Sequence, residues 1–173
     1  LEGYLMASPT GLDACITARE IAKSATVKTA ITFSDPGMVS NFKGAFEQVI
    51  GDGVDVLFCN EQEALDFTNT QNIQDALAHL QPLSQQGAIT LGAKGALVWD
   101  GQTTHIIAPI PTKAIDTNGA GDCFAGAVLA ALSNGQPIDT AGQLGCQAAS
   151  KVVSQFGPRL TLTDAQTVLS SVN

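Results

Sequence analysis

The sequence predicts an α/β fold with a mainly parallel central sheet, on three observations. Strand and helix patterns alternate along the 173 residues, as they do in layered α/β proteins. Residues 54–59 (Val-Asp-Val-Leu-Phe-Cys) are almost continuously apolar, which is typical of a strand buried on both faces of a parallel sheet. Motifs rich in glycine or in helix-capping residues stand at three successive strand-to-helix ends, where open α/β sheets bind their ligands.

In the first half of the chain, periodicity and turn signals mark each element. Alternating apolar residues at 2–6 favour a strand, and Ser8-Pro9-Thr10 then favours a helix start. Four apolar side chains share one helical face in residues 39–50, and Pro82 is expected to distort the end of the helix at 73–85. The predicted strands are 2–6, 28–33, 54–59 and 88–91, and the predicted helices are 9–24, 39–50 and 73–85.

In the second half, Asp100-Gly101 between two apolar runs is the strongest hairpin signal in the chain. Ser133-Asn134-Gly135 is a helix stop signal, and Thr163 is expected to cap the last helix. No repeat or linker interrupts the chain, so a single domain is predicted for residues 1–173. The predicted elements are strands at 96–99 and 104–108, a helix from Cys123 to the stop signal, and helices at about 137–154 and 160–172.

Composition restricts the partners and the compartment. The formal net charge of −8 would repel nucleic acids and anionic membranes, so neither is expected as a partner. The sequence has no run of about twenty apolar residues, and its four cysteines form no Cys-x-x-Cys pair. The cysteines are therefore expected to be small buried hydrophobic side chains, and the protein is expected to be cytoplasmic.

The most informative stretch is Asp116-Thr117-Asn118-Gly119-Ala120-Gly121-Asp122, directly before an apolar helical run. Two glycines flank a small residue, so backbone N–H groups can converge without interference from Cβ atoms. The following helix aims the positive end of its dipole at the same point. The stretch therefore predicts an anion-binding nest with the carboxylate of Asp122 beside it. Gly-Ala-Gly alone also occurs in ordinary turns, whereas the seven-residue string is much more specific.

This string resembles the Asp-Thr-x-Gly-Ala-Gly-Asp signature of the ribokinase-like (PfkB) family of carbohydrate and nucleoside kinases, and the resemblance covers residues 3–159. It implies a ribokinase-like layered α/β/α fold. It also implies that Asp122 is the general base for the substrate hydroxyl, and that the amides of Gly119, Ala120 and Gly121 form an anion hole for the transferred phosphoryl group. Phosphoryl transfer mainly requires positioning and stabilisation of negative charge, which such a site provides.

Asn60 and Glu63 follow the predicted buried strand and carry a second signal. Asn at a helix N-cap with Glu three residues later approximates a capping box, which is a purely structural explanation. The resemblance adds a functional one, because an Asn-x-x-Glu motif in this family helps to organise Mg²⁺ and the nucleotide phosphates, partly through water. Oxygen ligands one helical turn apart suit a hydrated Mg²⁺. Both explanations can hold together.

A third signal is Thr90-Leu91-Gly92-Ala93-Lys94-Gly95, which resembles the family segment Thr-x-Gly-x-x-Gly that lies along the nucleotide. The resemblance implies that Gly92 and Gly95 allow close backbone approach, that Thr90 donates a hydroxyl, and that Lys94 neutralises phosphate charge. A hairpin turn explains the same glycines without any ligand.

The resemblance thus predicts an ATP- and Mg²⁺-dependent kinase that transfers the γ-phosphate to a primary hydroxyl of a nucleoside or sugar. Asn118 at the variable position and the ending Gly157-Pro158-Arg159 resemble adenosine kinases, so adenosine is the favoured acceptor and ribose or fructose are alternatives. Asn118 is assigned to the nucleotide site, and residues 143–157 match one wall of the family's adenine pocket. In the family a monovalent cation such as K⁺ can also bind near Asp116 and Asn118.

Two further hypotheses belong to other classes. The chain opens at Leu1 within a strand-like segment, which suggests the C-terminal part of a longer kinase whose N-terminal part and lid are missing. Such a part could be a non-catalytic nucleotide-binding domain. A Rossmann dehydrogenase would need Gly-x-Gly-x-x-Gly after an early strand, and the sequence has neither this motif nor a Gly-x-x-x-x-Gly-Lys-Ser/Thr phosphate loop.

Overall fold

A computed structural model describes residues 1–101 and 103–170. The chain divides into two compact units, unit 1 (Leu1–Ile89) and unit 2 (Thr90–Asn173). In the described residues, strands form a mostly parallel sheet in the order β1-β2-β3-β4-β5, which confirms the predicted fold class. The strands are β1 (Ala30–Thr32), β2 (Val54–Asn60), β3 (Ser84–Thr90), β4 (Ala96–Asp100) and β5 (Thr103–Ile107).

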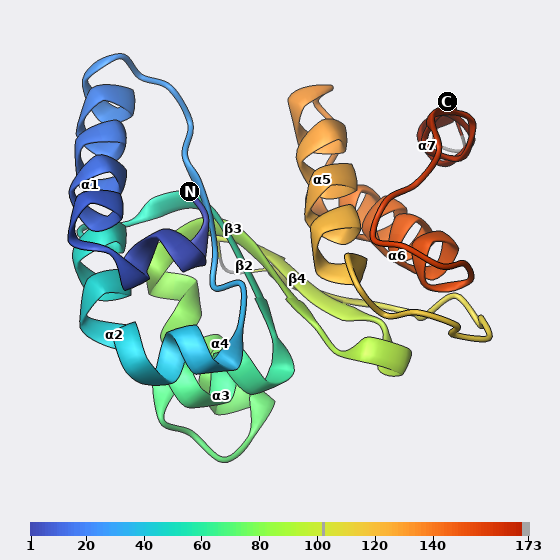
Figure 1. Ribbon diagram of the computed structural model, residues 1–173, viewed down its shortest axis with the longest axis horizontal. Helices are drawn as coiled ribbons and strands as arrows, with labels where there is room; N and C mark the ends of the chain where they lie inside the picture. The colour runs from blue at the N-terminus through green and yellow to red at the C-terminus, as the bar shows by residue number, and fades with distance from the viewer. Residues whose placement is uncertain (102, 171–173) are drawn as a thin grey trace. The chain divides into compact units, whose positions relative to one another are not determined.

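Unit 1 packs helices against parallel strands, as the sequence predicts. β1 pairs with β2 in parallel, with Ala30 opposite Val56. Helix α1 contacts α2, α2 contacts α3, and α3 contacts α4 (Figure 1). Phe33 stands at the centre of this core, with its ring centroid 5.1 Å from that of Phe46 and 4.6 Å from that of Phe67. The helices are α1 (Pro9–Ser24), α2 (Pro36–Ile50), α3 (Glu61–Thr68) and α4 (Ile73–Leu80).

The predicted strand at 2–6 is wrong. Gly3–Ala7 form a 3-10 helix, η1, and only Glu2 keeps a parallel bridge, to Thr32. The side chain of Glu2 accepts a hydrogen bond from the N–H of Tyr4, which turns the chain. A Cβ on Gly3 would lie 2.5 Å from the carbonyl oxygen of Phe33. The absence of a side chain at this position thus permits a tertiary contact that overrides the alternating pattern.

The predicted helix at 73–85 is shorter than expected. Helix α4 ends at Leu80, a 3-10 turn, η2 (Gln81–Leu83), contains Pro82, and β3 already starts at Ser84. Proline has no N–H to donate and clashes with the preceding turn of an α-helix, so the change of structure falls at the expected residue. β3 consequently begins four residues before the predicted Ala88, with a first half that is only weakly apolar.

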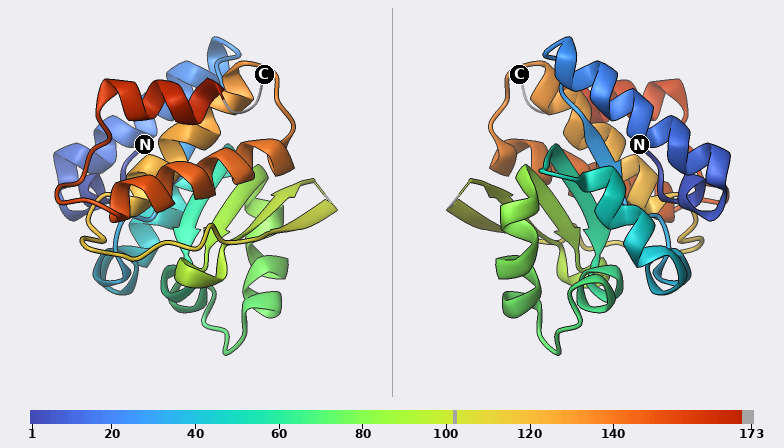
Figure 2. Two further views of the ribbon diagram at one scale, coloured as in Figure 1. Left: turned by 90° about the vertical axis from the view of Figure 1, so that its right-hand side faces the viewer. Right: turned by 90° about the vertical axis from the view of Figure 1, so that its left-hand side faces the viewer.

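The described part of unit 2 contains the predicted hairpin and three helices. β4 and β5 are antiparallel, with Val98 opposite His105, and Trp99 is fully buried. Helix α6 contacts α5, α7 and both hairpin strands, and Figure 2 shows it running beside α5 and α7. Its glycines explain the close packing: a Cβ on Gly142 would lie 2.9 Å from the side chain of Val98, and one on Gly145 would lie 2.7 Å from the ring of Phe124. The helices are α5 (Ala120–Ser133), α6 (Ile138–Val153) and α7 (Leu162–Ser170).

The last helix is confirmed, but its predicted cap is wrong. The hydroxyl of Thr161, not that of Thr163, accepts the N–H of Asp164, because the helix starts at Leu162. The end of the predicted range, residues 171–172, lies outside the described residues. Among the described residues, no helix is long and apolar enough to cross a membrane.

Candidate active site

The predicted anion-binding stretch forms the start of α5. Gly119 is the N-cap residue, and Ala120, Gly121 and Asp122 make up the first turn. The N–H of Ala120 reaches the carbonyl oxygen of Thr117 at 3.3 Å, and no side chain caps the helix. Because the first N–H groups of a helix have no partner within it, the N–H groups of this turn other than that of Ala120 are uncapped donors at the positive end of the dipole.

The two glycines of the stretch are required for different reasons. Gly119 has φ +75°, and a Cβ there would lie 2.2 Å from the carbonyl oxygen of Pro158. Only glycine fits such a position without strain. A Cβ on Gly121 would meet nothing within 4 Å. Gly121 therefore leaves open space directly beside the uncapped N–H groups, as an anion site requires.

Asp122, the predicted general base, is exposed in the first turn of α5. A carboxylate at the third helical position is stabilised by the positive end of the dipole. Its neighbour Cys123 is half-buried, and the thiol lies 3.8 Å from the carbonyl oxygen of Pro158. Burial raises the pKa of the Cys123 thiol.

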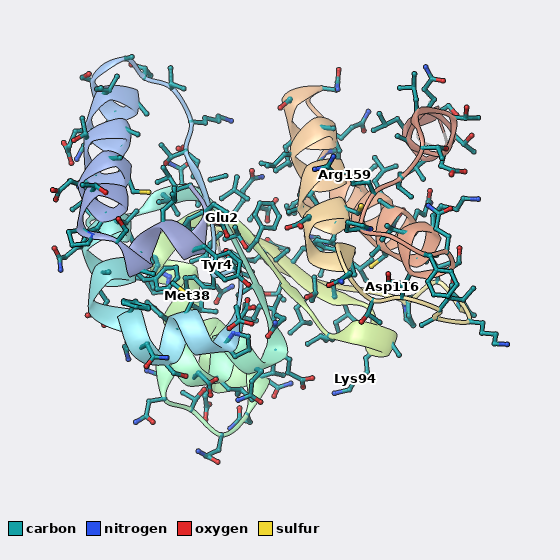
Figure 3. The ribbon with its side chains drawn as sticks, in the orientation of Figure 1. Glu2, Tyr4, Met38, Lys94, Asp116 and Arg159 are labelled. Atoms are coloured by element: carbon teal, nitrogen blue, oxygen red, sulfur yellow. The ribbon has the colours of Figure 1, made fainter. Side chains whose placement is uncertain are left out.

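Asp116 ties this loop to a segment far away in the sequence. Its Oδ1 accepts the N–H of Asn118 at 3.0 Å, and its Oδ2 accepts the N–H of Gly157 at 3.0 Å. The two N–H donors lower the pKa of the Asp116 carboxyl below its usual value. Figure 3 shows Asp116 in the loop before α5. The predicted cation role of Asp116 and Asn118 stays a prediction.

Asn60 and Glu63 form a complete capping box at the start of α3. Asn60 Oδ1 accepts the N–H of Glu63 at 2.8 Å, and Glu63 Oε2 accepts the N–H of Asn60 at 2.9 Å. Glu63 Oε1 also accepts the Asn60 side-chain amide at 2.7 Å. The structural explanation given for this motif is therefore confirmed, and its role toward Mg²⁺ stays a prediction.

Glu63 is an unusual member of a capping box because it is only 4% exposed. Burial raises the pKa of Glu63 to about 7, against the lowering effect of the backbone N–H of Asn60, and the negative charges of Asp35 and Asp66 add to the rise. Near neutral pH this carboxyl is therefore partly protonated, and a nearby cation would favour its ionised form.

The segment from Thr90 to Gly95 forms a tight turn between β3 and β4. Gly92–Lys94 are a 3-10 turn, η3, and the N–H of Leu91 donates to the carbonyl oxygen of Gly95 at 2.8 Å. Gly95 has φ +95°, and a Cβ there would lie 2.0 Å from the carbonyl oxygen of Ile107. The predicted turn is confirmed. Lys94 extends from η3 into solvent (Figure 3), and its role toward phosphate stays a prediction, as does that of Thr90.

The metal-binding groups of the described residues are sparse. Within residues 1–101 and 103–170, no three His, Cys, Asp or Glu side chains gather closely enough to hold a metal ion. The oxygens of Glu63 already accept two N–H groups, and the side chain is almost fully buried. Asn60 and Glu63 therefore fit a Mg²⁺ that keeps most of its water and phosphate ligands, rather than a site built by protein side chains alone.

One cavity of unit 1 lies away from these motifs. It measures about 500 Å³ and is lined by residues of α1, of the segment before β1 and of the starts of β2 and β3, among them Arg19, Lys28 and Asp55. The guanidinium of Arg19 donates to the carbonyl oxygen of Val49 at 3.1 Å, near the end of α2. Asp55 accepts the N–H of Thr29 at 2.7 Å. These polar groups serve the packing of unit 1, and the lining contains neither Asn60 nor Glu63.

The sequence singled out Gly157-Pro158-Arg159, but it did not predict the contact of this turn with the loop before α5. The Gly157-Pro158 turn supplies the carbonyl oxygen that faces Gly119 and the N–H that Asp116 accepts. The sequence does mark this turn with a Gly-Pro pair, but its partner lies 41 residues away. Of the other predicted residues, Asn60 and Glu63 belong to unit 1, and those from Thr90 onward belong to unit 2.

Comparisons with known proteins agree with this arrangement. The model of the pfkB family of carbohydrate kinases matches residues 1–165. The adenosine kinase of Saccharomyces cerevisiae is 30% identical over 168 residues, which cover 90% of this chain and 48% of that protein. The cytidine kinase of Thermococcus kodakarensis is 38% identical over 107 residues, which cover 60% of this chain and 38% of that protein.

Solved structures of kinases are also similar to this chain. The crystal structure of adenosine kinase from Sinorhizobium meliloti is 32% identical with a TM-score of 0.92, and the match covers 98% of this chain and 53% of that one. A double mutant of the fructokinase of Vibrio cholerae, solved with fructose, ADP and a potassium ion, is 24% identical and shares the fold with a TM-score of 0.80, over 99% of this chain and 58% of that one. This chain spans about half the length of these relatives. It belongs to the pfkB family of carbohydrate kinases.

Proposed function

We propose that this protein transfers the γ-phosphate of ATP to a primary hydroxyl of a nucleoside, with adenosine as the favoured acceptor. The observation that carries the proposal is the start of α5, where uncapped N–H groups face open space and Asp122 stands beside them. A site of this kind stabilises the negative charge that develops on a transferred phosphoryl group. Family membership supports the reaction class.

Each residue of the first turn has a role in this proposal. Asp122 accepts the proton of the acceptor hydroxyl as that oxygen attacks the γ-phosphorus. The N–H groups of Gly119 and Gly121 donate to the phosphoryl oxygens, and that of Ala120 joins them when it exchanges the carbonyl oxygen of Thr117, 3.3 Å away, for a phosphoryl oxygen. Asp122 is exposed, so an acceptor can reach its carboxylate without rearrangement of the helix.

The acceptor is inferred from two lines of support. The string Asp-Thr-Asn-Gly-Ala-Gly-Asp carries Asn118 at the variable position, which resembles adenosine kinases. Two of the relatives described above are adenosine kinases and a third is a cytidine kinase. The ribose unit with its primary hydroxyl is common to both nucleosides. Ribose and fructose are the alternative acceptors, since the family also phosphorylates sugars.

The proposal includes Mg²⁺ and K⁺ as cofactors that are expected to bind together with ATP. When bound, Mg²⁺ neutralises charge on the phosphates. Asn60 and Glu63 would hold it through water, because both side chains already hydrogen-bond each other. Thr90, Gly92, Lys94, Gly95 and Asn118 would contact the nucleotide. A K⁺ ion would lie near Asp116.

The test is ATP consumption by the purified protein with adenosine, cytidine, inosine, ribose and fructose, at fixed Mg²⁺ and with or without K⁺. We expect turnover on a nucleoside, and we expect Asp122→Asn to lower kcat by about 10²–10⁴-fold, as loss of a general base does. Binding of ATP to the variant should change little. Asp164→Asn, which changes a half-buried aspartate on α7, is the matched control and should keep normal turnover.

Two results would contradict the proposal. Near-normal turnover of Asp122→Asn would remove the assigned base. Binding of ATP without phosphorylation of any acceptor would favour the alternative, a non-catalytic nucleotide-binding domain.

A further inference from the structure

The cavity of unit 1 lies at the end of the sheet where β2 and β3 begin. Val54, the first residue of β2, and Ser84, the first residue of β3, both line it. Asn60 is the last residue of β2, and a strand that rises about 3.3 Å per residue places it about 20 Å from Val54. The cavity is therefore separate from the capping box of Asn60 and Glu63.

The size and lining of this cavity suit a small organic molecule. Its volume is about 500 Å³, within the range of about 300–1,000 Å³ that is typical of small-molecule sites. A water molecule takes up only about 30 Å³ in the liquid. Val27, Val54 and Pro82 contribute apolar surface beside the polar side chains of the lining. Apolar surface with a few polar groups is the usual composition of such a site.

Two buried polar atoms of the lining residues lack a hydrogen-bond partner. Ser84 is only 7% exposed, and among the described residues its Oγ has no partner, nor has Nε of Arg19. A buried donor without an acceptor destabilises the folded protein, so a function is the usual reason to keep one. Rotation about the Cα–Cβ bond of Ser84 can turn the hydroxyl toward a molecule in the cavity. A ligand with acceptor oxygens would satisfy it.

Positive charge gathers around this cavity. Three of the eight Lys and Arg residues line it, in a chain with a formal net charge of −8. Two of the three have structural partners: the Arg19 guanidinium donates to the carbonyl oxygen of Val49 at 3.1 Å, and Lys23 forms an ion pair with Asp52. Both lie where α1 and α2 end, and helix C-termini favour cations. Packing and helix dipoles therefore explain these two cations.

No such explanation covers Lys28. It lies in the segment that returns from the end of α1 to β1 (Figure 1), and it is exposed. Within residues 1–101 and 103–170 its side chain makes no hydrogen bond or ion pair. The lining holds two carboxylates, Asp52 and Asp55, against three cations, so its charge is neutralised by an anion rather than by a cation.

We propose that this cavity is a second ligand site, which binds a small organic molecule through a phosphate or carboxylate group. The Ser84 hydroxyl and the Lys28 ammonium group bind the anionic oxygens, and the rest of the molecule packs against Val27 and Pro82. Hydrogen bonds to a charged group are stronger than neutral ones, which makes Ser84 the main anchor. The site does not depend on the proposed kinase reaction.

The experiment titrates the ¹⁵N-labelled protein with glucose 6-phosphate, with citrate and with uncharged glucose, and follows the amide chemical shifts. Each titration is repeated at saturating Mg²⁺ and a non-hydrolysable ATP analogue. The variants are Ser84→Ala and Lys28→Gln. Lys113→Gln is the control, because Lys113 is an exposed lysine that does not line the cavity. Urea unfolding of Ser84→Ala without probe is measured in parallel.

We expect at least one anionic probe to shift the amides of residues 28, 29, 54, 55, 84 and 85 saturably, with a Kd below about 1 mM. Glucose should not shift them, and the ATP analogue should leave the Kd unchanged. Ser84→Ala should weaken binding at least about tenfold. Lys28→Gln should weaken it about two- to fivefold, as loss of an exposed charge does. Lys113→Gln should bind normally.

The stability of Ser84→Ala gives an independent readout. Because the hydroxyl has no partner in the free protein, its removal should leave the urea midpoint unchanged or raise it. A serine that only supports the fold would lower the midpoint when changed, and that result would overturn the proposal.

The titrations can overturn the proposal in three further ways. The first is that neither anionic probe shifts these amides, and the second is that glucose shifts them equally. The third is unchanged binding in both Ser84→Ala and Lys28→Gln. Displacement of the probe by the ATP analogue would assign the binding to the nucleotide site and also overturn it. A response to only one anionic probe would support the site and identify the phosphate or the carboxylate as its ligand group.

Discussion

The starts of α3 and α5 both carry an acidic residue at the third helical position, but side chains cap only the start of α3. At α3, Asn60 and Glu63 each satisfy the other's backbone N–H, and Glu63 is buried. At α5, Gly119 supplies no side-chain cap, and open space lies beside Gly121. In both helices the N-terminus is the positive end of the dipole. They differ in the acceptors of their first N–H groups, which are side chains of the same helix start at α3 and are not side chains at α5. The N–H groups of the capped start are occupied by its own chain, whereas our proposal requires those of the uncapped start to be available to a phosphate.

The comparison also separates two roles of carboxylates. Glu63 is turned inward, and burial raises its pKa to about 7. Asp122 stands at the equivalent third helical position of α5 but is exposed. The same residue class at the same helical position is therefore a structural cap in one unit and a candidate base in the other. The solvent exposure of the carboxylate decides between these two roles. The sequence motif alone does not reveal this exposure.

The strongest test of the comparison is Gly119→Ala. The added Cβ would lie 2.2 Å from the Pro158 carbonyl oxygen, so the loop before α5 must move. The amides of residues 119–121 would then no longer point at the phosphoryl group. We expect turnover to fall by at least about 10²-fold, as it does when an oxyanion donor is lost. Gly135→Ala is the matched control, because Gly135 has a similar φ of +78° but nothing within 4 Å of its Cβ position.

The difference between these two alanine variants isolates the contact with Pro158 from the strain of positive φ. Unfolding in urea should show that both variants lose stability, with a larger loss for Gly119→Ala. Equal turnover in the two variants would show that the contact with Pro158 does not position the anion hole.

A second test addresses the buried cap. Glu63 titrates near 7 in the folded protein, compared with its ordinary value of 4.5. A carboxyl whose pKa is raised by folding contributes stability below 4.5, and this contribution is lost as pH rises through 7. The difference corresponds to about 3 kcal/mol as an upper limit. Glu63→Gln, which resembles the protonated form, should therefore remove most of this loss between pH 5 and 8.

The measurement is the free energy of unfolding in urea at pH 5 and pH 8 for the unmodified protein, Glu63→Gln and Glu61→Gln. Glu61 lies in the same first turn but is less buried, so its variant should keep the pH dependence of the unmodified protein. If Glu63→Gln keeps that dependence as well, the carboxyl of Glu63 is not the group responsible.

The smallest expected effect is that of Gly121→Ala. Nothing lies within 4 Å of the Cβ position, and alanine is a better helix former than glycine, so we expect a gain of about 0.5–1 kcal/mol in the free energy of unfolding. A loss of turnover in this more stable variant would mean that the open space beside Gly121 is used by the phosphoryl group. A loss of stability would show that the space is not open in the folded protein.

Local signals in the sequence predicted much of the fold and part of the site. The capping box at Asn60 and Glu63, the hairpin at Asp100-Gly101 and the change of structure at Pro82 all depend on neighbouring residues, and the structure confirms them. Helix α5 begins three residues before the predicted Cys123, because its N-cap residue Gly119 has a left-handed backbone and gives no side-chain signal.

Features that depend on distant residues could not be predicted. The strand expected at 2–6 is a 3-10 helix because Gly3 packs against Phe33, 30 positions along the chain. The bond between Asp116 and Gly157 spans 41 positions. Neither residue carries a pattern that names its partner, since a hydrogen bond to a backbone N–H makes no demand on the side chain of the donor residue.

The central claim is that the start of α5, unlike that of α3, is open to phosphate. The most direct test is a titration of the ¹⁵N-labelled protein with inorganic tripolyphosphate in the absence of divalent metal, followed by amide chemical shifts. We predict that the amides of residues 119–122 shift in a saturable manner and that those of residues 61–63 do not. Shifts at residues 61–63 with none at residues 119–122 would contradict the account.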